Sequence, residues 1–383
     1  MKQEWPLVRL ENLFTFVGGG TPARNNSSFY SGNIPWITVK DMRGDIIDFS
    51  ELQITPEAIS SSATNLIPAG TVIFATRVGL GKVGILSVDA AINQDLKAAI
   101  PRRNDIIPNY FLYWMKSNAD VMVNAGVGAT VKGVTLEFIR SLSLPLPPVD
   151  EQKQIVQIVS HVASQIELRK KQLAKLDLLA KSRFIEMFGD SKAKFQRLGD
   201  ICSVGSSKRV FVEELQTKGI PFFRGTEVGR LAEDKDIEPT LFITEEHYIA
   251  LCKHTGKPKI GDLLLPSICP DGRVWCVNSE RPFYFKDGRV LWVKVPDAIN
   301  GCYLRFALSQ SIIENYSTLA SGITFAELKI VTLKEAPIPL PPLALQNEFA
   351  AFIEQLDKSK FTIRRSLEKL EMLYQALLQE YFG

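Results

Sequence analysis

Two segments of the chain carry mostly apolar side chains at alternating spacings of three and four residues. In the first segment these positions are Ile155, Val159, Val162, Ile166, Arg169, Leu173, Leu176, Ala180, Arg183 and Met187. In the second they lie 194 residues further along, at Phe349, Ile353, Leu356, Lys360, Ile363, Leu367, Leu370, Tyr374, Leu377 and Tyr381. Side chains at this spacing share one face of a helix, with the heptad period of a coiled coil. The pattern therefore predicts two long helices, at residues 150–190 and 343–383.

The ends of both segments carry signals that bound a helix. A Pro-Pro pair precedes each one, and proline restricts the residue before it to an extended backbone. Asp150 is the expected N-cap of the first helix, and Gly189 and Gly383 stand where C-terminal caps are expected. Each helix would be about 60 Å long and would need a partner for its apolar stripe. We predict that the partner is the other helix, packed antiparallel; the alternative is that each helix packs only on its own globular part.

The same spacing continues outside the helices, which marks an internal repeat. Matched pairs at this offset are Leu144-Pro-Leu-Pro-Pro148 with Ile338-Pro-Leu-Pro-Pro342, Gly128-Ala-Thr130 with Gly322-Ile-Thr324, Gln152 with Gln346, and Glu186-Met-Phe-Gly189 with Glu380-Tyr-Phe-Gly383. At drifting offsets, Arg9-Leu10 matches Arg197-Leu198, and Ile34-Pro-Trp36 matches Ile220-Pro-Phe222. The chain is therefore interpreted as two copies of one unit, with globular parts at residues 1–149 and 191–342, each followed by a long helix.

The globular parts contain short apolar runs separated by turn residues. These runs lie at residues 34–39, 71–76, 83–88, 262–265, 273–277 and 290–295. Runs of this length predict strands, and helices are expected at 108–118 and, in the second copy, at 300–309. The predicted fold class is α+β, with two similar strand-rich domains joined by two long helices that form an antiparallel coiled coil.

Composition and charge narrow the function classes. The 383 residues are 45% apolar, which is enough for more than one core. A net charge of +3 is too small for a polycation, so a nucleic-acid footprint would have to be local. The five cysteines all follow residue 200 and form no Cys-x-x-Cys pair, which is typical of reduced thiols and predicts no metal site. Without a long apolar run or a signal-like start, the chain is expected to be cytoplasmic.

Two catalytic motifs are weakly matched. Residues 79–84 fit G-x-G-x-x-G, but the second copy, residues 270–275, keeps only the middle glycine. We interpret both as hairpin turns that present Lys82 and Arg273. Residues 150–153 contain an E-x-K triplet, which is interpreted as a solvated helix start. The sequence contains no Gly-x-Ser-x-Gly elbow and no evident nucleophile, so no catalytic residue is predicted.

Basic, amide and hydroxyl residues in the predicted loops are the candidates for DNA contacts, because such side chains bind phosphates and base edges. In the first copy they are Arg24, Asn25, Asn26, Lys40, Arg43, Arg77, Lys82, Thr130 and Lys132. In the second copy they are Ser207, Lys208, Arg209, Arg224, Thr226, Arg273 and Arg289. Apolar residues off the helical seam are candidates for binding another protein: Ile158, Leu168, Leu178, Leu179, Phe184 and Phe188.

The order of these parts resembles the specificity subunit of type I restriction-modification systems, over the whole chain. The residues that carry the resemblance are Gly18-Gly-Gly-Thr-Pro22, Ile34-Pro-Trp36, Gly128-Ala-Thr130, Leu144-Pro-Leu-Pro-Pro-Val-Asp-Glu-Gln152 and the two helices. The second copy departs from this pattern, with Leu343-Ala-Leu-Gln346 and without the Gly-Gly-Thr-Pro turn.

The resemblance implies that each globular part is a target recognition domain that reads one half of a bipartite double-stranded DNA site. It implies that the helices set the spacing and dock two methyltransferase (modification) subunits, with restriction subunits where a system has them. S-adenosylmethionine, ATP and Mg would act only in those partners, and this chain would catalyse nothing. Two alternatives remain: a stand-alone two-domain DNA-binding regulator, and a nucleotide-dependent oxidoreductase built around residues 79–84.

Overall fold

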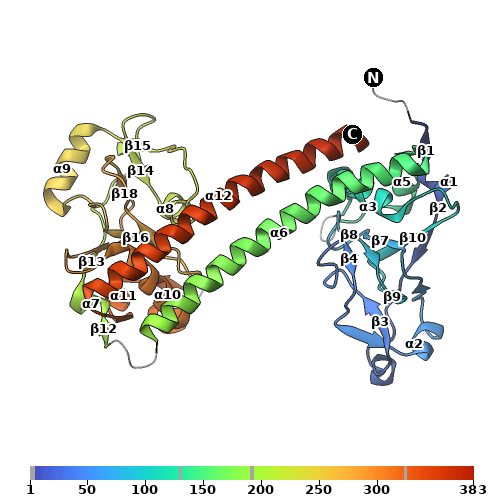
Figure 1. The fold of residues 1–383 in the computed structure, drawn as a ribbon, viewed down its shortest axis with the longest axis horizontal. Helices are drawn as coiled ribbons and strands as arrows, with labels where there is room; N and C mark the ends of the chain where they lie inside the picture. Colours follow the sequence, from blue (N-terminus) through green and yellow to red (C-terminus); the bar gives the residue numbers. More distant parts are fainter. Residues whose placement is uncertain (1–4, 129–131, 190–193, 323–325) are drawn as a thin grey trace. The chain divides into compact units, whose positions relative to one another are not determined.

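The computed structural model describes residues 5–128, 132–189, 194–322 and 326–383. The chain divides into two compact units (Figure 1). The first unit contains residues 1–172 and 363–383, and the second contains residues 173–362. Each long helix contributes one part to each unit. Within the described residues, no helix is long and apolar enough to cross a membrane.

The first unit is built on two sheets. One has the strand order β2 (Phe14–Gly18), β10 (Leu96–Pro101), β7 (Val72–Ala75), β8 (Val83–Leu86), β4 (Ile46–Ile47). The other has the order β5 (Leu52–Ile54), β3 (Ile34–Ile37), β9 (Ala90–Ile92), β6 (Leu66–Ile67). The remaining elements are β1 (Leu7–Arg9), paired with β11 (Ser143–Pro145), the helices α1 (Leu10–Leu13), α2 (Pro56–Ser60), α3 (Pro108–Ser117), α4 (Ala119–Asn124) and α5 (Leu136–Ser141), and the 3-10 turn η1 (Ser27–Tyr30). Strands β3 and β9 are parallel neighbours.

The second unit repeats this strand order, with one strand fewer in each sheet among the described residues. One sheet has the order β13 (Ser203–Gly205), β19 (Val290–Lys294), β16 (Leu263–Pro266), β17 (Trp275–Cys276). The other has the order β15 (Phe242–Ile243), β14 (Ile220–Phe223), β18 (Tyr284–Phe285), in which β14 and β18 are parallel. The remaining elements are the pairs β12 (Phe195–Arg197) with β22 (Pro337–Pro339) and β20 (Ala320–Ser321) with β21 (Glu327–Leu328), the helices α7 (Leu198–Ile201), α8 (Gly225–Ala232), α9 (Glu245–Thr255), α10 (Gly301–Leu319) and α11 (Ile330–Leu333), and η2 (Val212–Glu214).

Buried hydrogen bonds support the repeat in detail. Gln152 accepts a bond from the backbone N–H of Ile107, and Gln346 accepts one from the backbone N–H of Asn300, both at 3.0 Å. Each glutamine amide also donates to the carbonyl of the first proline in the preceding Pro-Pro pair, at 2.9 and 2.8 Å. A buried amide that bonds to backbone groups on both sides fixes the start of the long helix against its own globular part.

The helices α6 (Val149–Phe188) and α12 (Leu343–Phe382) confirm the heptad prediction. Of the twenty predicted seam positions, none is exposed. In the first unit, Lys170 of α6 pairs with Glu371 of α12 at 3.1 Å. In the second unit, Lys360 pairs with Asp177 at 2.6 Å. Also in the second unit, Arg183, further along α6 than Asp177, pairs with Glu348, earlier on α12 than Lys360, at 3.0 Å, so the two helices run antiparallel.

The predicted N-cap at Asp150 is wrong. Helix α6 already begins at Val149, so Asp150 lies in the first turn, where its carboxylate pairs with Lys153 at 2.9 Å. A carboxylate in the first turn is still favoured by the helix dipole. Gly189 and Gly383 do follow the last helical residues, and each donates its N–H to the carbonyl four residues earlier.

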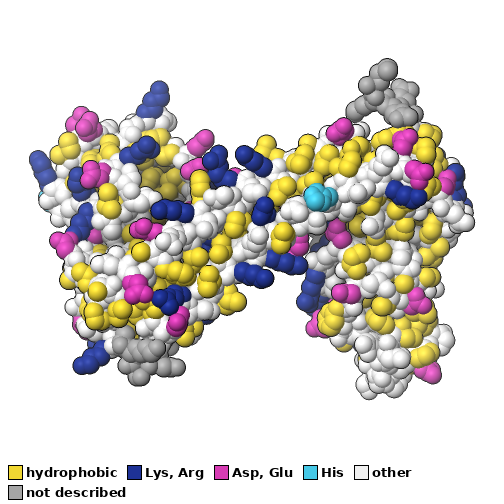
Figure 2. All heavy atoms as spheres, in the orientation of Figure 1, with side chains coloured by type: hydrophobic (Ala, Val, Ile, Leu, Met, Phe, Trp, Pro, Cys, Tyr) yellow, Lys and Arg dark blue, Asp and Glu magenta, His cyan; other side chains and the backbone are white. Residues whose placement is uncertain are grey.

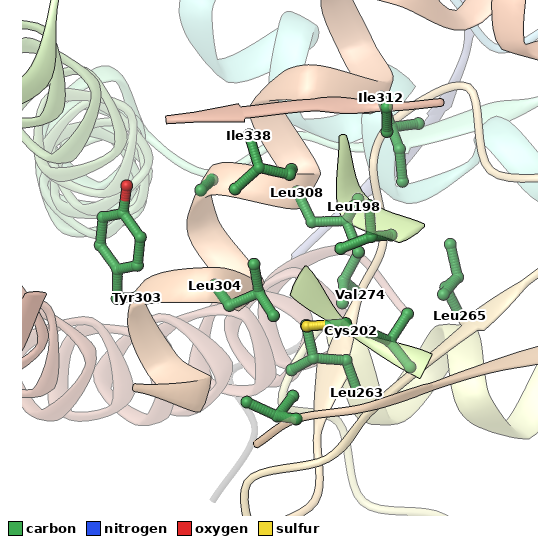
Figure 3. Close-up of a cluster of buried hydrophobic side chains, with 14 of the residues drawn as sticks. Leu198, Cys202, Leu263, Leu265, Val274, Tyr303, Leu304, Leu308, Ile312 and Ile338 are labelled. Atoms are coloured by element: carbon green, nitrogen blue, oxygen red, sulfur yellow. The ribbon is translucent and has the colours of Figure 1, made fainter. Parts of the chain in front are cut away.

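The core of each unit forms where the long helices pack on its globular part. In the first unit, the ring of Tyr110 lies 5.1 Å from that of Phe382, at the end of α12. In the second, Tyr303 lies 5.2 Å from Phe188, at the end of α6. Figure 3 shows the neighbouring part of the second core, where Leu304 and Leu308 of α10 pack near Leu263 of β16.

Helix α10 is longer than the predicted 300–309, because it continues to Leu319. Ile312 and Leu319 are both buried in the core of the second unit. Tertiary packing, which the local pattern did not reveal, therefore extends this helix by more than two turns.

Candidate nucleic-acid interface

The second unit contains a cleft of about 660 Å³ at the carboxyl ends of β14, β16 and β18, which we call the arginine cleft. Its lining is Val210, Val212, Leu215, Phe222, Arg224, Gly225, Thr226, Leu241, Pro266, Ser267, Ile268, Arg273, Lys286 and Arg289. Four of the seven residues predicted for this copy, Arg224, Thr226, Arg273 and Arg289, therefore lie in one cleft. The lining also contains two polar residues that the sequence pattern did not single out, Ser267 and Lys286.

The cations of the arginine cleft are each held by a carboxylate. Two nitrogens of Arg224, Nε and Nη2, contact the two carboxylate oxygens of Glu227 at 3.2 and 2.8 Å. Arg289 pairs with Glu327 on β21. Such charge-assisted pairs fix the direction of a guanidinium and leave its other N–H groups available, because arginine carries five.

Arg273 enters the cleft from the turn between β16 and β17. Its Nε lies 2.8 Å from Asp271, and a Cβ on Gly229 of α8 would lie 2.9 Å from its Nη1. The absence of a side chain at Gly229 therefore makes room for this guanidinium. The preceding residue, Gly272, has φ +68°, a conformation that favours glycine.

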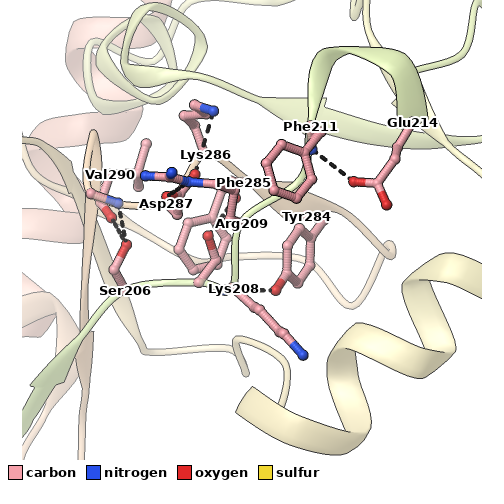
Figure 4. A network of polar contacts seen from close by, with 12 residues as sticks. Ser206, Lys208, Arg209, Phe211, Glu214, Tyr284, Phe285, Lys286, Asp287 and Val290 are labelled. Atoms are coloured by element: carbon pink, nitrogen blue, oxygen red, sulfur yellow. Dashed lines mark hydrogen bonds and ion pairs between the residues drawn. The ribbon is translucent and has the colours of Figure 1, made fainter.

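The remaining three predicted residues of this copy lie on the loop after β13, which Figure 4 shows from close by. The Ser207 hydroxyl donates to the carbonyl of Phe285 at 2.6 Å, and Arg209 Nε donates to Asp287 at 3.0 Å. The backbone N–H of Lys208 donates to the Tyr284 hydroxyl at 2.9 Å, while its side chain extends away from Asp287. Ser207 therefore uses its donor within the protein, whereas the exposed Lys208 ammonium has no hydrogen-bond or ion-pair partner within residues 5–128, 132–189, 194–322 and 326–383, and lies at the surface.

The first unit has a smaller cleft, of about 260 Å³, at the equivalent place, which we call the amide cleft. Its lining is Thr21, Arg24, Trp36, Thr38, Val39, Lys40, Asp41, Glu51, Leu52, Val78, Asn93, Gln94 and Asp95. It lies at the carboxyl ends of the parallel strands β3 and β9, as the arginine cleft lies at those of β14 and β18. Arg24 and Lys40 are exposed here, and Arg77 pairs with Asp95 at 3.8 Å.

Other predicted residues of the first copy lie around this cleft or have structural partners. Asn26 caps η1, with its side-chain oxygen accepting from the backbone N–H of Ser28. Lys82 donates its ammonium to the carbonyl of Val39 at 3.1 Å. Arg43, Asn25 and Lys132 are exposed, and Thr130 lies outside the described residues.

The glycine motif at residues 79–84 belongs to a hairpin, as predicted. Strands β7 and β8 pair antiparallel on either side of it, with Phe74 opposite Val83. Gly79 and Gly81 have φ of +76° and +87°, so the turn itself requires them. A dinucleotide fingerprint needs a helix after the motif, and a strand is present instead. This geometry removes the basis for the oxidoreductase alternative.

A further cleft of about 650 Å³ in the second unit contains none of the predicted residues. Its partly buried cation, Arg305, pairs with Asp357 of α12 at 3.0 Å. Two cysteines, Cys276 and Cys302, also line it, and burial raises the pKa of the Cys276 thiol to about 11. This thiol therefore stays protonated and is a poor nucleophile at neutral pH.

The predicted partner-binding residues separate into two groups. Ile158, Leu168, Leu178 and Leu179 are exposed on α6. Phe184 and Phe188 are not available, because Phe188 is 2% exposed and Phe184 packs 5.5 Å from the ring of Phe349. Both phenylalanines belong to the core of the second unit, which corrects their assignment.

Apolar side chains that the seam analysis overlooked are also exposed on the long helices. They are Ile185 on α6 and Leu343, Leu345, Phe361, Met372 and Leu373 on α12. Figure 2 shows hydrophobic, Lys and Arg side chains together on the visible surface of the long helices. Exposed apolar side chains on these helices are candidates for contacts with another protein.

Comparisons with known proteins agree with this geometry. A family profile described as "Type I restriction modification DNA specificity domain" matches residues 2–178 and 190–372. The MjaIX specificity subunit of Methanocaldococcus jannaschii is 25% identical over 98% of this chain and 92% of its own length. The Escherichia coli EcoR124I/EcoR124II specificity subunit is 35% identical over 44% of this chain and 46% of its own length.

Solved structures share the fold. The type I restriction-modification S subunit from M. genitalium aligns over 99% of this chain and 96% of its own, with a TM-score of 0.56 and 16% identity. A chain from a study of type I restriction-modification complex assembly aligns over 99% and 97%, with a TM-score of 0.57 and 19% identity. The duplicated sequence, the two units of one topology and the two profile matches lead to one conclusion: this chain belongs to the family of type I restriction modification DNA specificity domains and contains two of them in tandem.

Proposed function

We propose that this chain selects the DNA site of a type I restriction-modification complex, with each unit reading one half of a bipartite duplex site. The observation that supports this most directly is the pair of clefts at equivalent places in two units of the same topology. Both clefts contain arginine, lysine and hydroxyl side chains, and the amide cleft adds amides and three carboxylates. Two copies of one reader in a single chain suit a site with two separated halves.

DNA binding would combine contacts to phosphates, which supply affinity, with contacts to base edges, which supply specificity. Exposed cations outside the cleft linings, such as Lys208, Arg43 and Lys132, would neutralise phosphates and make affinity fall as salt rises. Side chains within the clefts would read base edges, and each bidentate contact would discriminate by about 1 to 3 kcal/mol. The DNA contacts would then be made by small groups of cations, since a net charge of +3 is too small for the whole molecule to attract DNA.

The long helices would separate the two readers and dock two methyltransferase subunits. At 1.5 Å per residue, a 40-residue helix is about 60 Å long. The exposed side chains Ile158, Leu168, Leu178 and Leu179 would bind these partners. A stand-alone regulator would gain nothing from apolar side chains exposed off the seam, so they favour the complex over that alternative.

The chemistry would belong to the partner subunits in a cytoplasmic complex. S-adenosylmethionine would supply the methyl group there, and ATP and Mg would serve translocation and cleavage where a restriction subunit is present. This chain would contribute site selection alone.

The proposal is tested by mapping adenine methylation across the host genome with the gene intact and with it deleted. We expect one two-part motif to lose methylation on deletion and to regain it when the gene is restored. Retention of every methylated motif, with the methyltransferase subunits expressed and active, would contradict the proposal.

A further inference from the structure

One backbone position is shared by the two clefts but carries different chemistry in each. It is the first residue after the parallel strand β3 or β14, occupied by Thr38 in the first unit and Arg224 in the second. In both units its backbone N–H donates to a carboxylate three residues later: Asp41 at 2.8 Å and Glu227 at 2.9 Å. The same turn therefore presents a hydroxyl in one unit and a guanidinium in the other.

In the amide cleft, the Thr38 hydroxyl also donates to Asp41, at 2.7 Å. Asp41 is buried and accepts a third bond from the N–H of Glu51 at 2.9 Å. Thr38 lines the cleft with its hydroxyl donor used on Asp41, and its oxygen already accepts from the backbone N–H of Lys40 at 3.3 Å, so one acceptor site remains. Neighbouring Asn93 and Gln94 add amide groups to the same lining.

In the arginine cleft, Glu227 binds the Nε and Nη2 nitrogens of Arg224 and leaves the outer N–H groups of Nη1 and Nη2. Two parallel donors on one edge match the O6 and N7 acceptors of guanine in the major groove. The Arg224 side chain is about half exposed, at 49%, while Glu227 is at 15%. The carboxylate is therefore fixed in the protein and the guanidinium is accessible.

We infer that this shared position determines specificity, and that Arg224 reads a guanine in the half-site bound by the second unit. Glu227 is the positioning residue, because it holds the guanidinium plane without reaching the base. The inference rests on the proposed function and goes further by naming the base class and the residue. The first unit, with Thr38 at this position, reads a different base at the matching place of its half-site.

A guanine contact explains the arrangement better than a phosphate contact does. A phosphate anchor needs net positive charge, and Glu227 neutralises much of the charge of Arg224. A base contact needs fixed direction, which a guanidinium held through two nitrogens provides. Glu227 also caps α8, so the capping turn and the orientation of Arg224 depend on one side chain.

The test is a selection from a randomised duplex library. The complex is purified from the host through a tag on the full chain, and the bound DNA is sequenced. For Arg224→Gln we expect the preference for guanine at one position of the second unit's half-site to fall by about 10- to 100-fold. Adenine should gain at that position, because glutamine pairs with the N6 and N7 atoms of adenine. All other positions of the motif should be unchanged.

Arg197→Gln is the matched control. Arg197 is an exposed arginine of the same unit, paired with Glu335 at 3.2 Å and outside the cleft. It should leave the motif unaltered. A wild-type complex that selects no motif would refute the proposed function itself. A wild-type motif that Arg224→Gln leaves intact, or changes at several positions of both halves, would refute only the inference.

Glu227→Gln provides a second variant that keeps the helix cap, because glutamine accepts the same backbone bond. It should weaken the preference for the same guanine by about 3- to 10-fold and change no other position. Thermal unfolding of both variants reports whether the unit is intact. If Arg224→Gln does not fold, an unchanged guanine preference in Glu227→Gln overturns the inference.

Discussion

The arginine cleft and the amide cleft share one backbone plan and differ in chemistry. Both lie at the carboxyl ends of a parallel strand pair, and both begin with the same capped turn. Four cations line the arginine cleft, whereas amides, hydroxyls, two cations and the three carboxylates of Asp41, Glu51 and Asp95 line the smaller amide cleft. Conserving the plan while varying the side chains allows two units of one fold to recognise different sequences.

The largest effect should come from the aromatic cores. Phe188→Ala removes a ring that packs on both Tyr303 and Phe349, at 5.2 and 5.5 Å, and should destabilise the chain by about 3 to 5 kcal/mol. Phe382→Ala, the equivalent change in the first unit, should cost about 3 kcal/mol, because Phe382 contacts Tyr110 and Tyr381 at its site. Urea unfolding of both variants measures the difference. A negligible loss of unfolding free energy for Phe188→Ala would contradict the placement of Phe188 in the core.

Next in size should be the two buried glutamines, which test whether the units are equivalent. Gln152→Ala and Gln346→Ala each leave a backbone N–H without its acceptor, at Ile107 and Asn300 respectively. Each substitution should cost about 1 to 3 kcal/mol of unfolding free energy. Equal losses support the repeat, whereas a loss confined to one unit would show that only one helix start depends on this contact.

The clefts themselves should differ in the salt dependence of DNA binding. Lys208→Gln removes a free ammonium from the second unit and should lower the slope of log affinity against log salt by about one, without changing the motif. Arg289→Gln should change the motif more than the slope, because Glu327 already compensates its charge. Binding titrations at several salt concentrations separate the two effects, and identical slopes for both variants would contradict this division.

The smallest effect on stability should come from the exposed helix. Leu178→Ser changes a side chain that is 64% exposed and should alter the unfolding free energy by no more than about 0.5 kcal/mol. It should nevertheless reduce the methyltransferase recovered with the tagged chain, if this surface docks that partner. Lys175→Ser, a polar change on the same helix, is the control. Full recovery with Leu178→Ser would place the docking surface elsewhere.

The sequence predicted the parts of the fold that depend on local periodicity. The heptad is a pattern of residues a few positions apart, and the repeat is found by comparing the two halves of the chain. Both can therefore be recognised without the fold, and none of the twenty seam residues is exposed. The hairpin at residues 79–84 was predictable because a turn needs glycine at particular positions.

The arginine cleft could not be predicted from the sequence. Arg224 and Lys286 follow two strands that are about 60 residues apart in the chain and become neighbours only through parallel pairing. No sequence pattern indicated that Glu227 and Glu327 would pair with Arg224 and Arg289. Phe184 and Phe188 were misassigned because the heptad pattern records which face meets the other long helix, but not that α10 packs on a second face.

The central claim is that each unit reads its own half of the DNA site. The most direct test replaces residues 195–339 with the matching part of a related specificity subunit and maps adenine methylation in the host. The account predicts that one half of the methylated motif changes while the other half stays the same. A motif that changes in both halves, or in neither, would contradict it.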